Sequence, residues 1–194
     1  GLIAFSDTIK PESADVIKAL SKRGIQAFLL TGDKEQAARH VAQEIGIQNF
    51  RAEVLPADKH DHINTLKAGG KTVGMLGDGI NDAPALVAAD IGLSFGGGTD
   101  IAVNAADVIF LNNSLNNLVY GYKIARATIS KIHQNLFWAF IYNLAGIPIA
   151  MGLLYPFTGT LLNPMFAGMA MAFSSVSVVT NTLLLKSRRY FQEI

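Results

Sequence analysis

The chain has no cysteine among its 194 residues. Without cysteine, this stretch of sequence contains no disulfide, no thiolate metal site and no thiol nucleophile. Charged residues are also missing from one long segment, because no Asp, Glu, Lys or Arg occurs between Lys131 and Lys186. Soluble domains are about one quarter charged, so a charge-free segment of this length indicates a nonpolar environment.

The sequence gives no sign of nucleic-acid binding or of a secretory signal peptide. The formal net charge is +1, and the basic residues form no stripe with interleaved aromatic residues, so no nucleic-acid partner is expected. The first residues lack the charged start and apolar stretch of a signal peptide. The chain opens on Gly1 inside an expected strand, and we therefore expect it to be a fragment of a longer protein.

Apolar runs with strand character alternate with helical patterns as far as Asn112. The expected strands are Leu2–Ser6, Ile25–Leu30, Arg51–Val54, Thr72–Leu76, Ile91–Phe95 and Val108–Leu111. The expected helices are Pro11–Arg23, Lys34–Ile45, Lys59–Ala68 and Asp82–Ala89. Gly24 and Gly46 follow helices and are expected as C-caps. This alternation predicts an α/β fold with a parallel sheet covered on both faces.

Polar residues gather where these strands end, which is where parallel sheets carry their functional groups. Thr31-Gly32-Asp33 follows the second strand, Lys59 follows the third, and Asp78 and Asp82 lie in the loop after the fourth. Two carboxylates in one loop suit Mg²⁺, which prefers oxygen ligands together with substrate phosphate. The Thr31 hydroxyl and the Lys59 ammonium could stabilise a phosphoryl group in transfer. A single Asp-Gly pair usually marks only a turn. Here, however, all three groups of polar residues follow strands of one predicted sheet, and this favours a functional site.

The remainder of the chain reads as helical and apolar. Asn112–Gln134 has apolar residues at helical spacing and a basic end, as expected of a stalk. Two segments, His133–Leu154 and Pro164–Leu185, each have about the 20 apolar residues that a membrane-spanning helix needs. Basic residues flank both, which places their ends in the cytoplasm and Tyr155–Asn163 outside. The alternative is a buried helical hairpin in a soluble protein.

A few polar side chains fall near the middle of these two segments. Tyr142 and Asn143 lie in the first, and Met171, Ser174 and Ser175 lie in the second. Small and polar residues in membrane helices often serve only packing and hydrogen bonding between helices. A methionine thioether, however, is a soft ligand that suits copper(I).

Several motifs resemble those of a known family. MLGDGINDAPAL (Met75–Leu86) resembles the hinge signature of P-type ATPases, and LLTGD (Leu29–Asp33) resembles the second family signature. DTIKPE (Asp7–Glu12) resembles the segment that re-enters the phosphorylation domain, and GGGTDIAVNAADVIFL (Gly96–Leu111) extends the likeness. The resemblance implies a haloacid-dehalogenase-like fold that uses ATP and Mg²⁺.

The same resemblance implies roles for single residues. Asp78 would hold Mg²⁺ with support from Asp82, while Thr31 and Lys59 would contact an aspartyl phosphate. Gly32 and Asp33 would line the nucleotide-facing side. The nucleophile of the family lies in a DKTGT sequence, which this chain lacks, as it lacks the nucleotide-binding and actuator domains.

A second resemblance concerns the transported ion. Tyr142-Asn143 and the Met-x-x-Ser-Ser of Met171–Ser175 look like the signature of the copper(I)-exporting members of the heavy-metal group. These members end two spans after the hinge signature and carry a Cys-Pro-Cys in the preceding span, which this chain does not include. The zinc and cobalt exporters carry charged or other residues in these helices.

The sequence therefore predicts part of a copper(I)-exporting pump and does not decide between copper and silver. The expected divisions are a partial phosphorylation domain (1–112), a stalk helix (113–132), two transmembrane helices (133–185) and a cytoplasmic tail (186–194). The expected partners are membrane lipid, the rest of the same pump and a copper chaperone. The expected location is a plasma (inner) membrane, crossed more than once, with the first part of the chain in the cytoplasm. Two alternatives stay open: a non-catalytic regulatory or assembly partner of a full pump, and a membrane-anchored phosphatase that uses Asp7 as nucleophile.

Overall fold

The computed structural model describes residues 8–159 and 164–187. The chain divides into two compact units, Gly1–Val119 and Tyr120–Ile194. The expected strand Leu2–Ser6, the candidate nucleophile Asp7 and most of the expected cytoplasmic tail lie outside the described residues.

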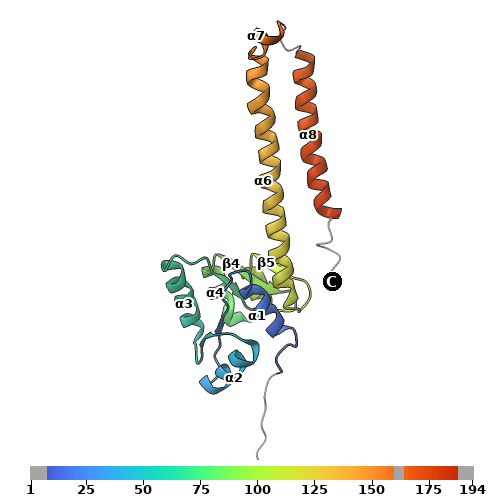
Figure 1. The fold of residues 1–194 in the computed structure, drawn as a ribbon. Coiled ribbons are helices and arrows are strands. Elements are labelled where there is room, and N and C mark those ends of the chain that lie inside the picture. Colours follow the sequence, from blue (N-terminus) through green and yellow to red (C-terminus); the bar gives the residue numbers. More distant parts are fainter. Residues whose placement is uncertain (1–7, 160–163, 188–194) are drawn as a thin grey trace, which may run out of the picture. The chain divides into compact units, whose positions relative to one another are not determined.

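The first unit is built from short parallel strands and helices (Figure 1). Strands β1 (Phe28–Leu30) and β2 (Asn49–Arg51) form one parallel pair, and a second sheet has the order β3-β4-β5. Strands β3 (Gly74–Leu76), β4 (Ile91–Phe95) and β5 (Val108–Phe110) of that sheet are parallel throughout. The predicted parallel α/β fold is confirmed, but the hydrogen-bonded ladder is divided between two sheets.

The helices of this unit lie between the strands, as the sequence pattern predicts. They are α1 (Ser13–Ser21), α2 (Glu35–Ile45), α3 (Pro56–Ala68), the 3-10 turn η1 (Ile80–Asp82), α4 (Ala83–Ala88) and α5 (Asp100–Ala105). Gly24 and Gly46 have φ values of 76° and 77°, in the left-handed region. Gly46 is the C-cap of α2, as predicted, whereas the C-cap of α1 is Lys22 and not Gly24. Helix α4 packs against α3, α5 and β4, and α1 packs against α2.

The core of the unit is small and centres on α4. Ala85, Leu86 and Ala102 are at most 1% exposed. In β4, a side chain at Gly92 would place its Cβ 2.9 Å from the carbonyl oxygen of Leu86. Glycine is therefore required where α4 crosses closest to the sheet. This tight packing fixes the loop Gly77–Asp82, which joins β3 to α4.

Contacts between segments far apart in the sequence close the unit. The Lys10 ammonium donates to the backbone carbonyl of Asn113 at 2.7 Å. The Glu12 carboxylate accepts hydrogen bonds from the Ser114 hydroxyl and the Leu115 N–H, both at 3.3 Å. The DTIKPE segment therefore lies beside the residues that precede the long helix α6.

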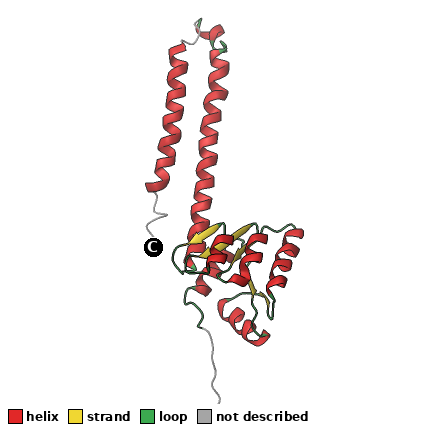
Figure 2. Cartoon of the chain, turned by 180° about the vertical axis from the view of Figure 1, so that it is seen from behind, coloured by secondary structure: helices red, strands yellow, loops and turns green. Residues whose placement is uncertain are grey.

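The second unit consists of helices, shown in red in Figure 2. Helix α6 (Asn116–Ala150) has 35 residues, α7 (Tyr155–Thr158) is short, and α8 (Pro164–Ser187) has 24 residues. The sequence predicted a stalk and a separate span, whereas α6 runs through both without a break. A short helix also occupies part of the connection that was expected to be a loop.

The predicted membrane spans are not confirmed. Among the residues that the structure describes, no helix has the combination of length and apolar character needed to cross a membrane.

Candidate functional site

The loop after β1 is held in shape by its own side chains. The Thr31 hydroxyl donates to the Asp33 carboxylate at 2.7 Å and accepts from the Asp33 N–H at 3.1 Å. Backbone hydrogen bonds join this loop to the residues after β2, since the Val54 N–H donates to Thr31 and the Glu53 N–H to Asp33. The predicted residues Thr31 and Asp33 therefore share one rigid turn, with Gly32 between them.

Lys59 and Asp82 form a largely buried ion pair. The Lys59 ammonium lies 2.7 Å from Asp82 Oδ1, and each side chain is only 15% exposed. Lys59 comes from α3 and Asp82 from η1, so two candidate residues 23 positions apart are brought into contact. Because a buried charge needs compensation, each group depends on the other.

Gly77 makes room for this pair. A Cβ at Gly77 would lie 2.6 Å from the Cβ of Asp82, closer than real atoms approach. The glycine that begins the GDG sequence is therefore required because Asp82 folds back against it. This requirement is local to the loop and does not depend on a ligand.

Asp78 is placed differently from Asp82. Its side chain is exposed, and its backbone carbonyl accepts a hydrogen bond from the Thr99 N–H at 3.0 Å. The hydroxyl of Thr99 also accepts from the Ala102 N–H and begins α5. The loop after β4 thus holds the backbone of Asp78 and leaves its carboxylate at the surface.

These residues fit a magnesium ion that is shared with a phosphate group. The loop carries the exposed Asp78 carboxylate and the largely buried Asp82 carboxylate, which pairs with Lys59. Mg²⁺ typically takes one or two carboxylates together with substrate phosphate and water. No group of three or more His, Cys, Asp or Glu residues suited to a metal occurs in the described ranges 8–159 and 164–187.

The residues predicted to bind a transported ion lie on two helices. Tyr142 and Asn143 are on α6, where the Tyr142 ring lies 6.3 Å from that of Trp138 and the Asn143 amide donates to the Ala139 carbonyl. Met171, Ser174 and Ser175 are on α8. Ser174 is half-buried, whereas the side chain of Met171 is not described.

The sequence analysis missed a buried histidine on α3. His62 is 9% exposed, its ring lies 4.7 Å from that of Phe28, and its Nε2 has no hydrogen-bond partner among the described residues. Burial, and secondarily the Arg51 charge, lower the pKa of His62. Helical spacing could have found it, because His62 follows Lys59 by three positions and precedes Leu66 by four.

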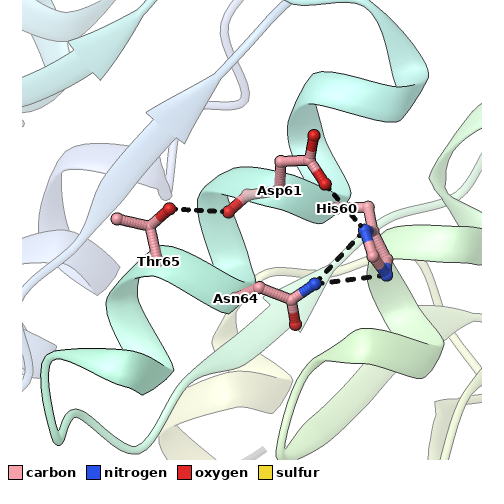
Figure 3. Close-up of polar contacts among 4 residues, drawn as sticks. All are labelled: His60, Asp61, Asn64 and Thr65. Carbon is pink, nitrogen blue, oxygen red and sulfur yellow. Dashed lines mark hydrogen bonds and ion pairs between the residues drawn. The ribbon is translucent and has the colours of Figure 1, made fainter.

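A surface cavity of about 390 Å³ lies beside His62, between α3 and the residues after β2. Asp61 lines this cavity, and Figure 3 shows that it also belongs to a polar cluster on α3. In the cluster, a hydrogen bond of 3.1 Å joins His60 to Asp61, and Asn64 lies 3.3 Å from both ring nitrogens of His60. The Thr65 hydroxyl donates to the Asp61 carbonyl at 2.9 Å. All of these are neighbours along one helix, so the cluster supports α3 itself.

Comparisons with known proteins bear on the site and the fold. The family model "Hydrolase: haloacid dehalogenase-like hydrolase" matches residues 1–90. The probable copper-transporting ATPase PacS of Synechocystis sp. is 51% identical over 185 residues, which are 95% of this chain and 25% of that protein. The silver exporting P-type ATPase of Salmonella typhimurium is 50% identical over 189 residues, 97% of this chain and 23% of that protein.

Among solved structures, a zinc-transporting PIB-type ATPase in its E2.Pi state is similar with a TM-score of 0.79 and 36% identity. The match covers 92% of this chain and 28% of that structure's chain. The chain thus spans about a quarter of the length of the curated relatives it matches.

Proposed function

Because the chain belongs to the heavy-metal P-type ATPases, in the copper-transporting group, we propose that it is part of an ATP-driven pump that exports copper(I), with silver as a further substrate. The pump would form a phosphoenzyme on an aspartate that lies outside this chain. The observation that carries the proposal is the Lys59–Asp82 pair of 2.7 Å at the loop after β3. It brings together a cation and a carboxylate of the kind that phosphoryl transfer requires.

In this proposal the residues of the first unit act on the phosphoryl group. Asp78 and Asp82 would hold Mg²⁺, which neutralises charge on the transferring phosphoryl group. Lys59 would exchange its contact with the Asp82 carboxylate for one with a phosphoryl oxygen, because both are anionic oxygens that an ammonium binds well. The Thr31 hydroxyl, which donates to Asp33 in the structure, would donate to the same phosphoryl group. Gly32 and Asp33 would face the nucleotide, ATP.

The residues of the second unit would hold the transported ion. We propose that Tyr142 and Asn143 on α6 act with Met171, Ser174 and Ser175 on α8 as part of the copper(I) site. The thioether of methionine favours this soft ion. The absence of charged residues between Lys131 and Lys186 argues against a zinc or cobalt type of site.

We assign the protein to a membrane and propose that it crosses it more than once, within 133–185, in a plasma (inner) membrane. The charge-free segment and the basic residues on both of its sides support this arrangement. The first unit would then face the cytoplasm. The proposed partners are membrane lipid, the actuator and nucleotide-binding domains and earlier helices of the same pump, and a copper chaperone.

Phosphoenzyme formation in the intact pump tests this proposal. With radiolabelled ATP and copper(I), Asp78→Asn should abolish the acid-stable phosphoenzyme. The matched control is Asp15→Asn, which makes the same change at an exposed position of α1 and should leave labelling unchanged. Normal labelling of Asp78→Asn would remove Asp78 from the site, and an unmodified pump that is not phosphorylated in a copper-dependent way would contradict the proposed function.

A further inference from the structure

Five polar side chains connect α6 to α8 near one end of the helix pair. They form what we call the clamp: Lys131, Gln134 and Asn135 on α6, and Asn181 and Thr182 on α8. The Lys131 ammonium donates to Asn181 Oδ1 at 2.5 Å and to Gln134 Oε1 at 3.1 Å. Asn181 Nδ2 donates to Asn135 Oδ1 at 2.8 Å, and Asn135 Nδ2 donates to the Thr182 hydroxyl at 2.9 Å.

The hydrogen bonds of the clamp run in one direction. From Lys131 through Asn181 and Asn135 to Thr182, each group accepts from its predecessor and donates to its successor, and the Thr182 hydroxyl ends the series on the Val178 carbonyl at 2.8 Å. Turning the Asn181 amide around would oppose its NH₂ group to the Lys131 ammonium and its oxygen to Asn135 Oδ1, and turning the Asn135 amide around would oppose the two NH₂ groups. The series therefore selects one relative placement of the two helices.

Lys131 makes the clamp sensitive to that placement. It is 7% exposed, and in the described part of the chain its partners are neutral amide oxygens and no carboxylate. An ammonium removed from water must keep its hydrogen bonds to be tolerated. A slip of one helix along the other would separate Lys131 from Asn181 and leave the charge without that partner. Buried polar groups of this kind are known to fix helix register.

The clamp sets the level of the proposed ion-binding residues. Figures 1 and 2 both show α6 and α8 side by side and running in opposite directions. Residues seven positions apart lie on the same face of a helix, about 10 Å apart along its axis. Seven positions after Asn135 is Tyr142, and seven positions before Asn181 and Thr182 are Ser174 and Ser175. Because Asn135 contacts Asn181 and Thr182, we expect Tyr142 to lie opposite Ser174 and Ser175, one heptad further along each helix.

The helix ends give an independent check of this register. Helix α6 ends at Ala150 and α8 begins at Pro164. Ala150 follows Asn135 by about 15 positions and Pro164 precedes Asn181 by about 17, so the two ends differ in height by less than one helical turn. The helix ends are therefore consistent with the register that the clamp sets.

We propose that the clamp is a positioning device that aligns Tyr142 with Ser174 and Ser175, and so determines the affinity of the site for copper(I). This inference rests on the function proposed above. Loosening the clamp misaligns ligands contributed by different helices and leaves the phosphoryl-transfer residues of the first unit intact.

The test uses the intact pump and two readouts. The copper concentration for half-maximal ATPase activity reports the ion site, and copper-free phosphorylation by inorganic phosphate reports the residues around Asp78. For Asn181→Ala we expect the half-maximal copper concentration to rise on the order of tenfold, because a hydrogen bond to a charged group is lost. Phosphorylation by inorganic phosphate should stay within about twofold of the unmodified pump, since a factor of two is under 0.5 kcal/mol. Asn181→Asp keeps the acceptor for Lys131 and should recover part of the affinity.

A milder pair of variants guards against loss of folding. Thr182→Val removes the hydroxyl that accepts from Asn135 with little change of shape, and Thr180→Val makes the same change at an exposed position outside the clamp. Thr182→Val should raise the half-maximal copper concentration about threefold, roughly the effect of one neutral hydrogen bond, and Thr180→Val should not. Unchanged copper dependence in both Thr182→Val and Asn181→Ala would overturn the proposal.

The register can also be measured without copper. Spin labels on Phe140→Cys and Val176→Cys, both exposed, should give one narrow distance that broadens or shifts by about one helical turn, 5 Å, when Asn181→Ala is added. An unchanged distance would also overturn the proposal. If the unmodified pump lacks copper-stimulated activity while this distance responds to Asn181→Ala, the proposed function fails and the register role stands.

Discussion

Lys59 and Lys131 are both largely buried, one in each compact unit, but they are neutralised in different ways. Lys59 is 2.7 Å from a carboxylate, whereas Lys131 is held by the amide oxygens of Gln134 and Asn181. An ion pair keeps its charges balanced and can exchange one anion for another. A charge held by neutral dipoles has no counterion to exchange, so its partners fix position. The Lys59 ion pair therefore suits phosphoryl transfer, whereas the hydrogen bonds of Lys131 suit the alignment of α6 with α8.

The largest effect should follow from breaking the ion pair. Lys59→Met leaves the Asp82 carboxylate buried without a partner, which should destabilise the first unit by ~3 kcal/mol. It should also abolish phosphoenzyme formation in the intact pump. Thermal unfolding and labelling by ATP measure the two effects. Lys22→Met, at an exposed position, is the control and should change neither; a stable Lys59→Met variant would mean that Asp82 is well solvated.

A smaller effect is expected from crowding the same pair. Gly77→Ala places a Cβ 2.6 Å from that of Asp82, so Asp82 must move away from Lys59, at a cost of about 2 kcal/mol. Gly97→Ala is a matched control, because its Cβ would meet nothing within 4 Å. A lower melting temperature for Gly77→Ala alone is the expected result. Equal melting temperatures would show that the loop shifts freely.

Removing the other lysine should cost less than removing Lys59. Lys131→Met leaves one hydrogen-bond acceptor on Asn181 and one on Gln134, both neutral, so the expected loss of stability is about 1 kcal/mol. The comparison with Lys59→Met is made by thermal unfolding of the intact pump. If Lys131→Met destabilises as strongly as Lys59→Met, the two lysines are not neutralised in the different ways described here.

The smallest effect concerns His62, a buried base whose Nε2 has no hydrogen-bond partner among the described residues. Burial lowers the pKa of His62 below its ordinary value of 6.5, so the unfolded chain binds a proton more readily than the folded one. Stability should therefore fall as the pH drops below about 6.5. His62→Leu should weaken this pH dependence, measured as melting temperature between pH 7.5 and 5.5. The exposed His40→Gln should keep it, and an identical pH profile in His62→Leu would exclude His62 as its source.

Much of the first unit could be predicted from the sequence. Strand β4 has the predicted bounds Ile91–Phe95, because it lies between two strands and is paired along its length. Strands β1, β3 and β5 are shorter than predicted, since apolar residues continue beyond the hydrogen bonds of each ladder. Strand β2 (Asn49–Arg51) begins two residues before the predicted Arg51–Val54 and shares only Arg51 with it. Helix α5 was missed because its sequence DIAVNA is too short to show helical periodicity, although Thr99 in front of it is a typical N-cap.

The contacts within the sites could be predicted only in part. The sequence predicted a common site for Lys59 and Asp82 at the edge of one sheet; the structure shows that they touch, although β2 and β3, the strands that precede them, belong to different sheets. Lys131 was read as a basic residue at the end of a stalk. Its partner Asn181 is 50 positions away in the sequence, and local sequence patterns do not predict contacts at that separation. For the same reason the sequence predicted which residues lie in each helix of the second unit and gave no register between the helices.

Helix α6 has a mechanical consequence. Its 35 residues form a rod about 50 Å long at the usual rise per residue. Within the second unit, the part of the rod from Tyr120 to the residues before Pro148 contains no proline, so a push or a turn applied at Tyr120 is transmitted along it with little loss. The one proline, Pro148, lacks an N–H and leaves the Leu144 carbonyl without its usual helical partner, so compliance is concentrated beyond Tyr142 and Asn143. Force that enters at the start of the rod is therefore delivered to those two residues before it reaches the part that can bend.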